Sequence, residues 1–422
     1  MIIIHDMNRY HAPLPRALTP TVALALRSHP VVVLTGARQT GKSTLIRELL
    51  PPPKRDYRTL DETAVLDRAR QEPDALLSGR LPLTLDEIQR SPELLLAVKR
   101  SVDRDRRPGR FLLSGSANLA LMRRVSESLA GRAVYLVLHP FTPSERRGGG
   151  GTGKWDALVR DPRALEGTHA PFERLEEAVT ASGFPPAWLA RGARPRQAWL
   201  DGYVRTYLDR DLQQLAAIEN LADFRRLMRI VALRSGGLEN QSSMARDAGL
   251  PQPRVRRYLN LMETSYLLHR LPAYAVNRTR RLVKAPRLFL CDGGLAAFLA
   301  GIGSPAELRD PTLAGMLLET LVLGDLQAWR EGTMPRPEVL YWRTVSGAEV
   351  DFVIETGGRL VPVEVKSASR VGLGDARHVA SFLREYPGAA RHGLVLYSGA
   401  RMERLADRIW AVPLTAALSL AR

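Results

Sequence analysis

Residues 31–49 read VVVLTGARQTGKSTLIREL, and this stretch decides the fold class. Its first five residues are typical of a buried β-strand, and Gly36 and Gly41 enclose a turn in which backbone N–H groups can point inward. The residues after Lys42 carry apolar side chains at helical spacing, so a helix is expected to begin there. A strand, a glycine turn and a helix in this order predict a phosphate-binding loop. The predicted nucleotide-binding residues are Gly36, Ala37, Arg38, Gln39, Thr40, Gly41, Lys42, Ser43 and Thr44.

A second stretch, GGGGTGKW at residues 148–155, has the same outline of glycines and lysine. It follows PSERR rather than a strand, and Trp155 stands where a phosphate loop needs Ser or Thr. Four consecutive glycines favour a flexible chain over a fixed cradle. We therefore predict that residues 148–154 form a mobile connector and that the nucleotide binds at residues 36–43.

The stretch LPLTLDEIQR, residues 81–90, offers the carboxylates that ATP chemistry needs. Lys42 is predicted to reach the β- and γ-phosphates, and Ser43 and Asp86 are predicted to hold Mg²⁺ with its water ligands. Glu87 is the predicted base that polarises the attacking water. The alternative is an acidic strand end that faces solvent. ATP and Mg²⁺ are thus the expected cofactors.

Two further positions are candidates for contact with the γ-phosphate. Ser114 or Ser116, in the stretch FLLSGS, is expected to sense this phosphate, although a plain turn after a strand explains both serines equally well. Arg132 precedes an apolar run and is a candidate arginine finger, within its own subunit or towards a neighbouring one. The abundance of arginine in the chain argues against a special role for Arg132.

Five short apolar runs alternate with helical patterns and predict an α/β fold with a parallel sheet covered by helices. They are VVVLT (31–35), YRTL (57–60), LPLTL (81–85), RFLLS (110–114) and AVYLVL (133–138). Pro82 is unusual in a central strand, so that strand is expected to start after it. Residues 171–285 have a helical pattern throughout. From residue 338 three strand-like runs, a helix over 375–386 and a strand over 393–398 are expected.

The composition favours partners that carry negative charge. The chain has 422 residues and a formal net charge of +17, which points to DNA or RNA first and to an anionic membrane surface second. Its one cysteine, Cys291, cannot form an internal disulfide, so the cytoplasm is the expected compartment. The N-terminal residues do not have the pattern of a signal peptide, and no apolar run is long enough to predict a membrane span.

Several of these stretches together resemble a large prokaryotic family of AAA-type ATPases with a C-terminal domain of unknown function. They include LTGARQTGKSTLIREL, LDEIQRSPELL, LLSGSANL, ESLAGRA, YLDRDL, LVKAPRLFLCDGGLAAFL, LLETLVLGDL, YWRTVSGAEVDFVI and PVEVKS. The resemblance implies a P-loop ATPase core, a winged-helix-like middle and a C-terminal fold similar to PD-(D/E)xK nucleases. The glycine-rich insertion at 148–153 departs from the family pattern, and we do not expect this insertion to matter.

Residues 241–268 have the form of a helix-turn-helix. Ser242 or Ser243 is expected to cap the first helix, Gly249 to end it, and two prolines to suit the first turn of the second helix. Arg254, Arg256 and Arg257 lie off the apolar face of that helix and are the predicted nucleic-acid contacts, to phosphate rather than to bases. The basic stretch 270–287 is expected to form a wing. A solvated charged face without nucleic acid is the alternative.

The C-terminal part carries carboxylates at the spacing of a nuclease metal site. Glu364 and Lys366 share one side of a predicted strand, and a short hairpin is expected to bring Asp351 beside them. Glu319, on a predicted helix, would complete the ligands of a Mg²⁺ ion, while Lys366 would position or activate the hydrolytic water. Ion pairing of Lys366 with its acidic neighbours is the alternative. Such folds also serve as binding or scaffold modules, so cleavage does not follow from the residues alone.

The predicted domains are an ATPase core over 1–165, a helical lid or linker over 166–200, a winged-helix-like domain over 201–285 and a nuclease-like domain over 286–422. The first functional hypothesis is an ATP-hydrolysing, DNA-binding protein with a nuclease-type metal site, acting on DNA that includes branched forms. The second is a regulatory NTPase switch whose C-terminal domain docks a partner protein or DNA without cleaving. The third is a metal-dependent nuclease with a structural nucleotide site. A homo-oligomer is a further expectation.

Overall fold

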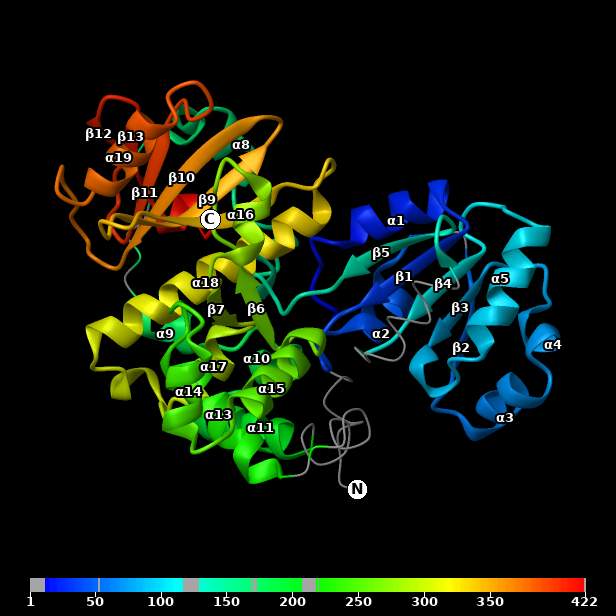
Figure 1. Ribbon diagram of the computed structural model, residues 1–422. Helices are drawn as coiled ribbons and strands as arrows, with labels where there is room; N and C mark the ends of the chain where they lie inside the picture. The colour runs from blue at the N-terminus through cyan, green and yellow to red at the C-terminus, as the bar shows by residue number, and fades with distance from the viewer. Residues whose placement is uncertain are drawn as a thin grey trace.

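The computed structural model describes residues 12–51, 54–116, 129–167, 169, 172, 174–206, 218 and 220–420. Its N-terminal part contains a five-stranded sheet in the order β2-β3-β4-β1-β5, and all of its strand pairs are parallel (Figure 1). The strands are β1 (Val31–Thr35), β2 (Asp56–Thr59), β3 (Leu83–Asp86), β4 (Phe111–Ser114) and β5 (Ala133–Val137). These are the five predicted runs, and β3 begins after Pro82 as expected. The α/β P-loop fold of this part is therefore confirmed.

Alternating side chains of the central strands are buried on both faces of this sheet. Val31 and Val33 belong to an apolar cluster with the helices α3, α4 and α5, whereas Val32 and Leu34 pack in another cluster with α1. A strand buried on both faces reads as a continuous β-branched run, as VVVLT does. The helices are α1 (Thr19–Ser28), α2 (Lys42–Thr44, continued by a π-helical turn over Leu45–Leu49), α3 (Thr63–Gln71), α4 (Pro73–Leu77) and α5 (Leu94–Arg104). A 3-10 turn spans Ile88–Arg90.

The glycine-rich segment after the sheet differs from its prediction. Trp155, which follows the predicted connector, is fully buried and begins a helix. Gly153 N–H and Trp155 Nε1 both donate hydrogen bonds to Asp325, and Lys154 N–H donates to the carbonyl of Ala417. The description as a mobile connector is therefore wrong, because distant residues hold the segment in place. The elements here are α7 (Pro143–Arg146), α8 (Trp155–Arg160), a 3-10 turn (Pro162–Leu165), α9 (Leu175–Thr180), α10 (Pro185–Leu189) and α11 (Ala193–Thr206).

The middle part is a helical bundle followed by a two-stranded antiparallel sheet. Its elements are α13 (Leu221–Leu233), α14 (Gln241–Ala248), α15 (Gln252–Thr264), β6 (Leu268–Leu271), α16 (Arg278–Val283), β7 (Arg287–Leu290) and α17 (Gly293–Leu299). The predicted helix-turn-helix is α14 and α15, and Gly249 ends α14 in a left-handed conformation as expected. The cap is Asn240 rather than a serine, because its side chain accepts the N–H of Ser243. The strand β6 corrects the expectation of a wholly helical stretch.

The C-terminal part contains a six-stranded mixed sheet in the order β12-β13-β11-β10-β9-β8. Its elements, after a 3-10 turn over Pro305–Glu307, are α18 (Pro311–Gly332), β8 (Glu338–Arg343), β9 (Glu349–Thr356), β10 (Arg359–Lys366), α19 (Arg377–Glu385), β11 (Gly393–Tyr397), β12 (Glu403–Ala406), β13 (Ile409–Pro413) and α20 (Leu414–Ala417). The strands and the helix predicted from residue 338 onward are all present. In Figure 1 this part and the middle part lie together on one side of the ATPase sheet, with α18 between the C-terminal sheet and the helices.

The predicted domain boundary between 285 and 286 falls inside the β6–β7 sheet. The stretch YLDRDL lies outside the described residues. The domain limits themselves stay predictions. No helix in the described ranges combines the length and the apolar character that crossing a membrane requires.

Candidate nucleotide site and carboxylate cluster

The loop between β1 and α2 has a backbone that only glycine fits at its start. Gly36 has a φ of 140°, and a Cβ built on it would lie 2.3 Å from the carbonyl oxygen of Leu138. Gly41 has a φ of 91° and directly precedes α2. Left-handed backbone of this kind is strained for any residue with a Cβ. The two glycines that suggested the loop therefore have a structural reason to be glycine.

Lys42 is buried beneath this loop. Its Nζ donates hydrogen bonds to the carbonyl oxygens of Gly36 at 3.1 Å and Ala37 at 2.9 Å. Burial lowers the pKa of Lys42 to about 8, while the nearby carboxylates of Glu87 and Asp86 act in the opposite direction. An ammonium group held only by two carbonyls gains strongly from an arriving phosphate, which supplies negative charge and better acceptors.

Ser43 and Asp86 lie together, as predicted. The Ser43 hydroxyl donates to Asp86 Oδ2 at 2.7 Å, and the Tyr57 hydroxyl donates to the same oxygen at 2.8 Å. The pair meets because β1 and β3 are parallel and end at the same edge of the sheet. One hydroxyl and one carboxylate beside a phosphate loop are the small protein ligand set that Mg²⁺ uses, with phosphates and waters completing its shell. The residues therefore fit Mg²⁺.

Glu87 follows in a left-handed conformation, with a φ of 56°. Burial raises the pKa of its carboxyl, and the neighbouring Asp86 adds to that effect. Gln89 Nε2 donates to Glu87 Oε2 and, at 3.0 Å, to the hydroxyl of Ser116. Gln89 therefore connects the predicted base to one of the two predicted sensor serines. The other, Ser114, is buried, and its hydroxyl has no hydrogen-bond partner among the described residues.

Arg132 lies away from this site. It immediately precedes β5, whereas the phosphate loop follows the opposite end of the parallel strand β1. Its guanidinium instead pairs with Asp103, with Nε 2.7 Å from Oδ1 and Nη2 3.1 Å from Oδ2. A role of Arg132 within its own subunit is therefore wrong for this arrangement. A role towards a neighbouring subunit stays a prediction.

Residues far from the motif also hold the loop, and no sequence pattern predicted them. Arg16 is buried and donates from Nη1 to the carbonyl of Thr40 at 2.7 Å and from Nη2 to that of His139 at 2.6 Å. Tyr266 of the middle part shares a hydrogen bond of 2.9 Å with the hydroxyl of Thr35, the last residue of β1. Their roles depend on tertiary contacts, which local spacing does not reveal.

The three predicted nucleic-acid residues lie on α15 with different surroundings. Arg256 and Arg257 are exposed, and the Arg257 guanidinium lies over the ring of Tyr258. Arg254 is half-buried, and its Nη1 lies 3.4 Å from Asp223 of α13. Arg254 therefore has a structural contact, whereas the other two face outward as predicted.

The C-terminal carboxylates lie close together, and they come from the strands and the helix that were expected to supply them. Lys366 Nζ lies 2.7 Å from Glu364 Oε1, and Asp351 Oδ2 accepts the N–H of Val365 at 2.9 Å. Burial raises the pKa of Glu319 and of Glu364 to about 8, and Asp351 is the next cause for each. The strands β9 and β10 and the helix α18 thus bring together the four predicted residues.

Arg287 of β7 occupies the middle of this cluster and was not predicted. Its Nη2 lies 2.5 Å from Glu319 Oε2, and its Nη1 lies 3.4 Å from Asp351 Oδ1. It is buried, and its Nε also donates to the carbonyl of Gly236. A buried guanidinium supplies the positive charge that these carboxylates need.

This arrangement does not fit a metal ion. Among the described residues no three His, Cys, Asp or Glu side chains are placed to hold one. Glu364 Oε2 is buried without a hydrogen-bond donor in the described part of the chain, but Arg287 and Lys366 are the cations that face the cluster. Metal binding by Glu319, Asp351 and Glu364 therefore stays a prediction and would require Arg287 to move.

Three stretches of the chain match known families. Residues 28–146 match a family described as "AAA domain", and they contain the whole nucleotide site described above. Residues 172–306 and 314–417 match two families, each described as "Domain of unknown function", DUF8612 and DUF4143.

Two relatives are similar to this chain over most of its length. The "Uncharacterized protein Rv2008c" of Mycobacterium tuberculosis and the "Uncharacterized protein Mb2031c" of Mycobacterium bovis are each 34% identical over 392 residues, covering 92% of this chain and 81% of each relative. A Walker-type ATPase of Pyrococcus abyssi has a solved structure with a TM-score of 0.41 and 15% identity, covering 67% of this chain and 94% of that one. The chain belongs to the family of these two mycobacterial proteins, and its N-terminal part is an ATP-binding P-loop domain of the AAA type.

Proposed function

We propose that the protein hydrolyses ATP and that the nucleotide state is passed to the middle and C-terminal parts. The observation that supports this proposal best is the meeting of Lys42, the Ser43–Asp86 pair and Glu87 at one edge of the sheet. These are a phosphate ligand, a metal-binding pair and a base, which is the set that phosphoryl transfer to water requires.

Each residue has a separate role in this proposal. Lys42 and the loop N–H groups bind the β- and γ-phosphates. Ser43 and Asp86 would hold Mg²⁺, which would neutralise developing charge on the phosphate oxygens. Glu87 accepts a proton from the water whose oxygen attacks the γ-phosphorus, and ADP leaves with the electrons of the broken P–O bond. Gln89 orients Glu87 and connects this carboxylate to Ser116, so that Ser116 can register the γ-phosphate.

Glu87→Gln tests the assignment of the base. The amide keeps the size of the side chain but cannot accept the proton, so we expect ATP binding to persist while turnover falls by about 10²-fold or more. Phosphate release and calorimetric ATP titration measure the two quantities. The control is Glu93→Gln, which changes a carboxylate hydrogen-bonded to Ser91 beyond the catalytic turn. Normal turnover in Glu87→Gln would remove Glu87 as the base.

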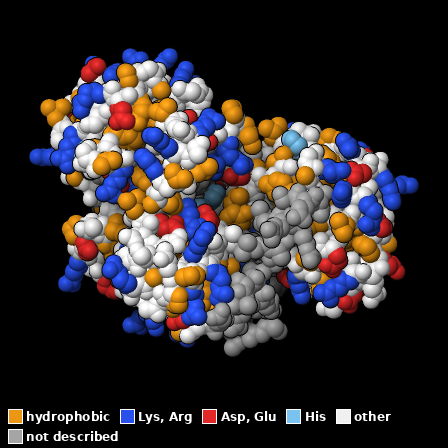
Figure 2. Space-filling view, in the orientation of Figure 1, with side chains coloured by type: hydrophobic (Ala, Val, Ile, Leu, Met, Phe, Trp, Pro, Cys, Tyr) orange, Lys and Arg blue, Asp and Glu red, His pale blue; other side chains and the backbone are white. Residues whose placement is uncertain are grey.

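For the middle part we propose a winged-helix-like module that contacts nucleic acid. Support comes from the order of α13, α14 and α15 followed by the β6–β7 pair, with an isolated antiparallel bridge between Leu238 and Arg287. The outward-facing Arg256 and Arg257 and the net charge of +17 suit contact with phosphates. Figure 2 shows Lys and Arg side chains scattered over the described parts of the visible face, which favours non-specific contact over one concentrated patch.

For the C-terminal part the placement of Arg287 favours a module that does not cleave. The order α18-β8-β9-β10-α19-β11 supports the proposed likeness to PD-(D/E)xK folds. The cluster nevertheless carries its own guanidinium in place of an ion. A regulatory NTPase switch with a non-cleaving docking domain is therefore the second candidate function. ATP turnover measured with single-stranded, duplex and four-way-junction DNA separates the two, since only a DNA-dependent enzyme is stimulated, with a steep inverse dependence on salt.

A further inference from the structure

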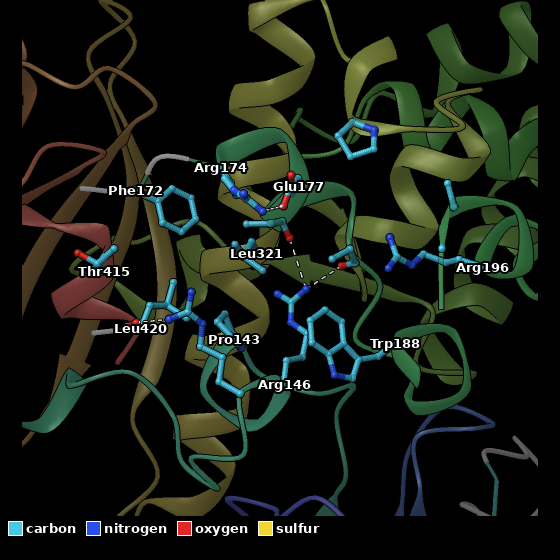
Figure 3. A pocket seen from close by; sticks show the side chains of 16 residues that line it. Pro143, Arg146, Phe172, Arg174, Glu177, Trp188, Arg196, Leu321, Thr415 and Leu420 are labelled. Carbon is cyan, nitrogen blue, oxygen red and sulfur yellow. Dashed lines mark hydrogen bonds and ion pairs between the residues drawn. The ribbon is translucent and has the colours of Figure 1, made fainter. Parts of the chain in front are cut away.

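A cavity of about 740 Å³ lies between the ATPase, middle and C-terminal parts, away from the nucleotide loop (Figure 3). The elements α7, α9, α10 and the start of α11 form most of its wall, with contributions from α18 and α20. Four arginines and one glutamate line it, together with the aromatic side chains of Trp188 and Phe172. The arginines are Arg146, Arg147, Arg174 and Arg196.

Arg146 is the buried arginine of this wall. Its Nη1 donates to the carbonyls of Ala181 at 2.9 Å and Ala178 at 3.4 Å, and its guanidinium lies 5.5 Å from the ring centre of Trp188. Its Nε and Nη2 make no hydrogen bond to any described residue, and neither atom is sealed from solvent. Burial lowers the pKa of Arg146 to about 10, which still leaves it charged at neutral pH. The cavity thus contains guanidinium N–H groups that await an acceptor.

The other three arginines are only partly satisfied. Arg196 is half-buried, and its hydrogen bond within the described part of the chain is a long one of 3.4 Å to the carbonyl of Ala187. Arg147 donates to the carbonyl of Leu420, and Arg174 lies 3.2 Å from Glu177. In Figure 3 the side chain of Arg196 extends towards the space beside Trp188. One carboxylate, that of Glu177, lines the hollow beside the four guanidinium groups, while Asp292 and Asp325 act on Arg146 from behind the wall.

We propose that this cavity is a second ligand site and that it binds an organic anion with an aromatic or apolar body. The anionic group, a carboxylate, phosphate or sulfonate, would accept hydrogen bonds from Arg146 and Arg196. The body would pack on Trp188, Phe172 and Leu321. Binding sites for small molecules combine a mostly apolar wall with a few directed polar groups in this way. An anion also relieves the repulsion between the buried guanidinium of Arg146 and the half-buried one of Arg196.

The site is distinct from the nucleotide loop but close to it in the fold. The short helix α10 carries Trp188 on the arginine cavity, while its Pro185 and Leu189 line a small hollow beside Gly41 and Thr44 of the loop. A ligand on one side of α10 and a nucleotide on the other thus contact the same five-residue helix. The assignment itself does not depend on ATP hydrolysis.

The probe for the test is 1-anilinonaphthalene-8-sulfonate, an aromatic body with one sulfonate, titrated into the full-length protein without nucleotide. We expect one bound probe per chain, with energy transfer from tryptophan that falls in Trp188→Phe. Arg196→Gln should raise the dissociation constant about five- to tenfold, since it removes one charge-assisted contact. Arg174→Gln should raise the dissociation constant less, since it removes only a positive charge from the cavity wall. Arg205→Gln, on the same helix as Arg196 but paired with Asp201 outside the cavity, is the matched control and should bind as the unmodified chain does.

A neutral analogue separates charge recognition from simple apolar binding. N-phenyl-1-naphthylamine has the same rings without the sulfonate, and we expect it to bind at least tenfold more weakly and without sensitivity to the two arginine changes. Circular dichroism and thermal unfolding establish that the variants are folded. Equal binding of both probes, or unchanged sulfonate binding in Arg196→Gln and Arg174→Gln, would overturn the proposal.

Discussion

At the residue scale, the nucleotide site depends on a lysine that is costly to bury. Within the described residues, Lys42 has two carbonyl oxygens as its hydrogen-bond acceptors, and burial depresses its pKa to about 8. A triphosphate replaces these acceptors with charged oxygens. The lysine therefore contributes more to nucleotide binding than an exposed lysine does, because its charge is already desolvated.

Lys42→Ala is expected to lower ATP affinity by about 10²-fold or more. The change removes a charge-assisted contact to the phosphates and leaves the carbonyls of Gly36 and Ala37 without their donor. Isothermal calorimetry with a non-hydrolysable ATP analogue measures the effect. Lys54→Ala, an exposed lysine before β2, controls for the loss of one positive charge. Equal affinity of Lys42→Ala and Lys54→Ala would contradict the assignment of residues 36–43.

The sequence was sufficient to place together the candidate residues that lie within contiguous stretches, although their roles stay predictions. Lys42, Ser43 and Glu87 belong to contiguous stretches in which a strand, a turn and the reactive side chain follow one another. Gln89 and Arg16 could not be found in this way, because their partners are Ser116 and the carbonyls of Thr40 and His139. Arg132 shows the converse error, since its place in the sequence beside a strand does not tell which edge of the sheet it occupies.

At the element scale, helix α8 is an element that sequence periodicity does not predict. A run of glycines has no periodicity, yet Trp155 is buried because Asp325 of α18 accepts both its Nε1 and the N–H of Gly153. The partner lies on another helix, so the local sequence carried no sign of it. The five strands of the first sheet were recognisable because burial on both faces makes each a short apolar run.

Asp325 should make the stability of the fold fall as pH rises. Burial raises its pKa from the usual 3.8 to about 7, so the folded chain holds a proton between these values that the unfolded chain has released. The free energy of unfolding contributed by this group is full below about pH 4 and declines by up to about 1.4 kcal/mol per pH unit until about pH 7.

Denaturant unfolding of Asp325→Asn between pH 4 and pH 8 measures this contribution. The variant cannot titrate, so we expect a shallower decline with pH than in the unmodified chain, whatever its absolute stability. Asp156→Asn is the control, because Asp156 also accepts a tryptophan Nε1, at 3.1 Å from Trp329, but is exposed. Parallel pH profiles for Asp325→Asn and the unmodified chain would contradict this account.

The helix α15 carries the prediction for nucleic acid. Changing Arg256 and Arg257 together to Ala should weaken duplex binding regardless of sequence and reduce the salt dependence by about two counterions, because both side chains are exposed. Arg254 is left intact because of its contact with Asp223. Fluorescence anisotropy at several salt concentrations measures both effects.

The control removes the same charge elsewhere, by changing Arg163 and Arg404 to Ala. Both are exposed and pair with nearby aspartates outside the middle part. If the two double variants bind DNA equally well, α15 does not face the DNA backbone, and only the overall charge of the protein determines the affinity.

At the scale of the whole molecule, single side chains join the three parts. Tyr266 reaches Thr35 at the end of β1, and Glu331 of α18 accepts the N–H of Val137 in β5 at 2.9 Å. Both ATPase-side residues end strands of the nucleotide-binding sheet. A conformational change of the phosphate loop on nucleotide binding therefore has a short route to the middle and C-terminal parts through these packed contacts.

The C-terminal cluster marks the limit of prediction from sequence at this scale. The spacing of Asp351, Glu364 and Lys366 within two strands was enough to place them together, and the helical Glu319 joined them as expected. Arg287 lies 32 residues before Glu319, and its strand β7 belongs to a different sheet from β9 and β10. No local sequence pattern connects Arg287 to the cluster. The cation that decides the chemistry of the cluster was therefore invisible before the fold was known.

Arg287→Ala is expected to loosen the joint between the middle and C-terminal parts. Without the guanidinium, Glu319, Asp351 and Glu364 face one another with Lys366 as the remaining cation of the cluster among the described residues, so the variant should lose about 3 kcal/mol or more of stability at neutral pH. Lowering the pH should recover part of that loss, because protonation removes the repulsion. Mn²⁺ should stabilise Arg287→Ala but not the unmodified chain, since the freed carboxylates then lack a cation. Thermal unfolding with and without Mn²⁺ measures these effects, with Arg287→Lys as the charge-preserving control. If the unmodified chain nicks DNA in Mn²⁺ and Lys366→Ala abolishes nicking, the Arg287 guanidinium does not block the cluster. The nuclease hypothesis then replaces the proposal of a module that does not cleave.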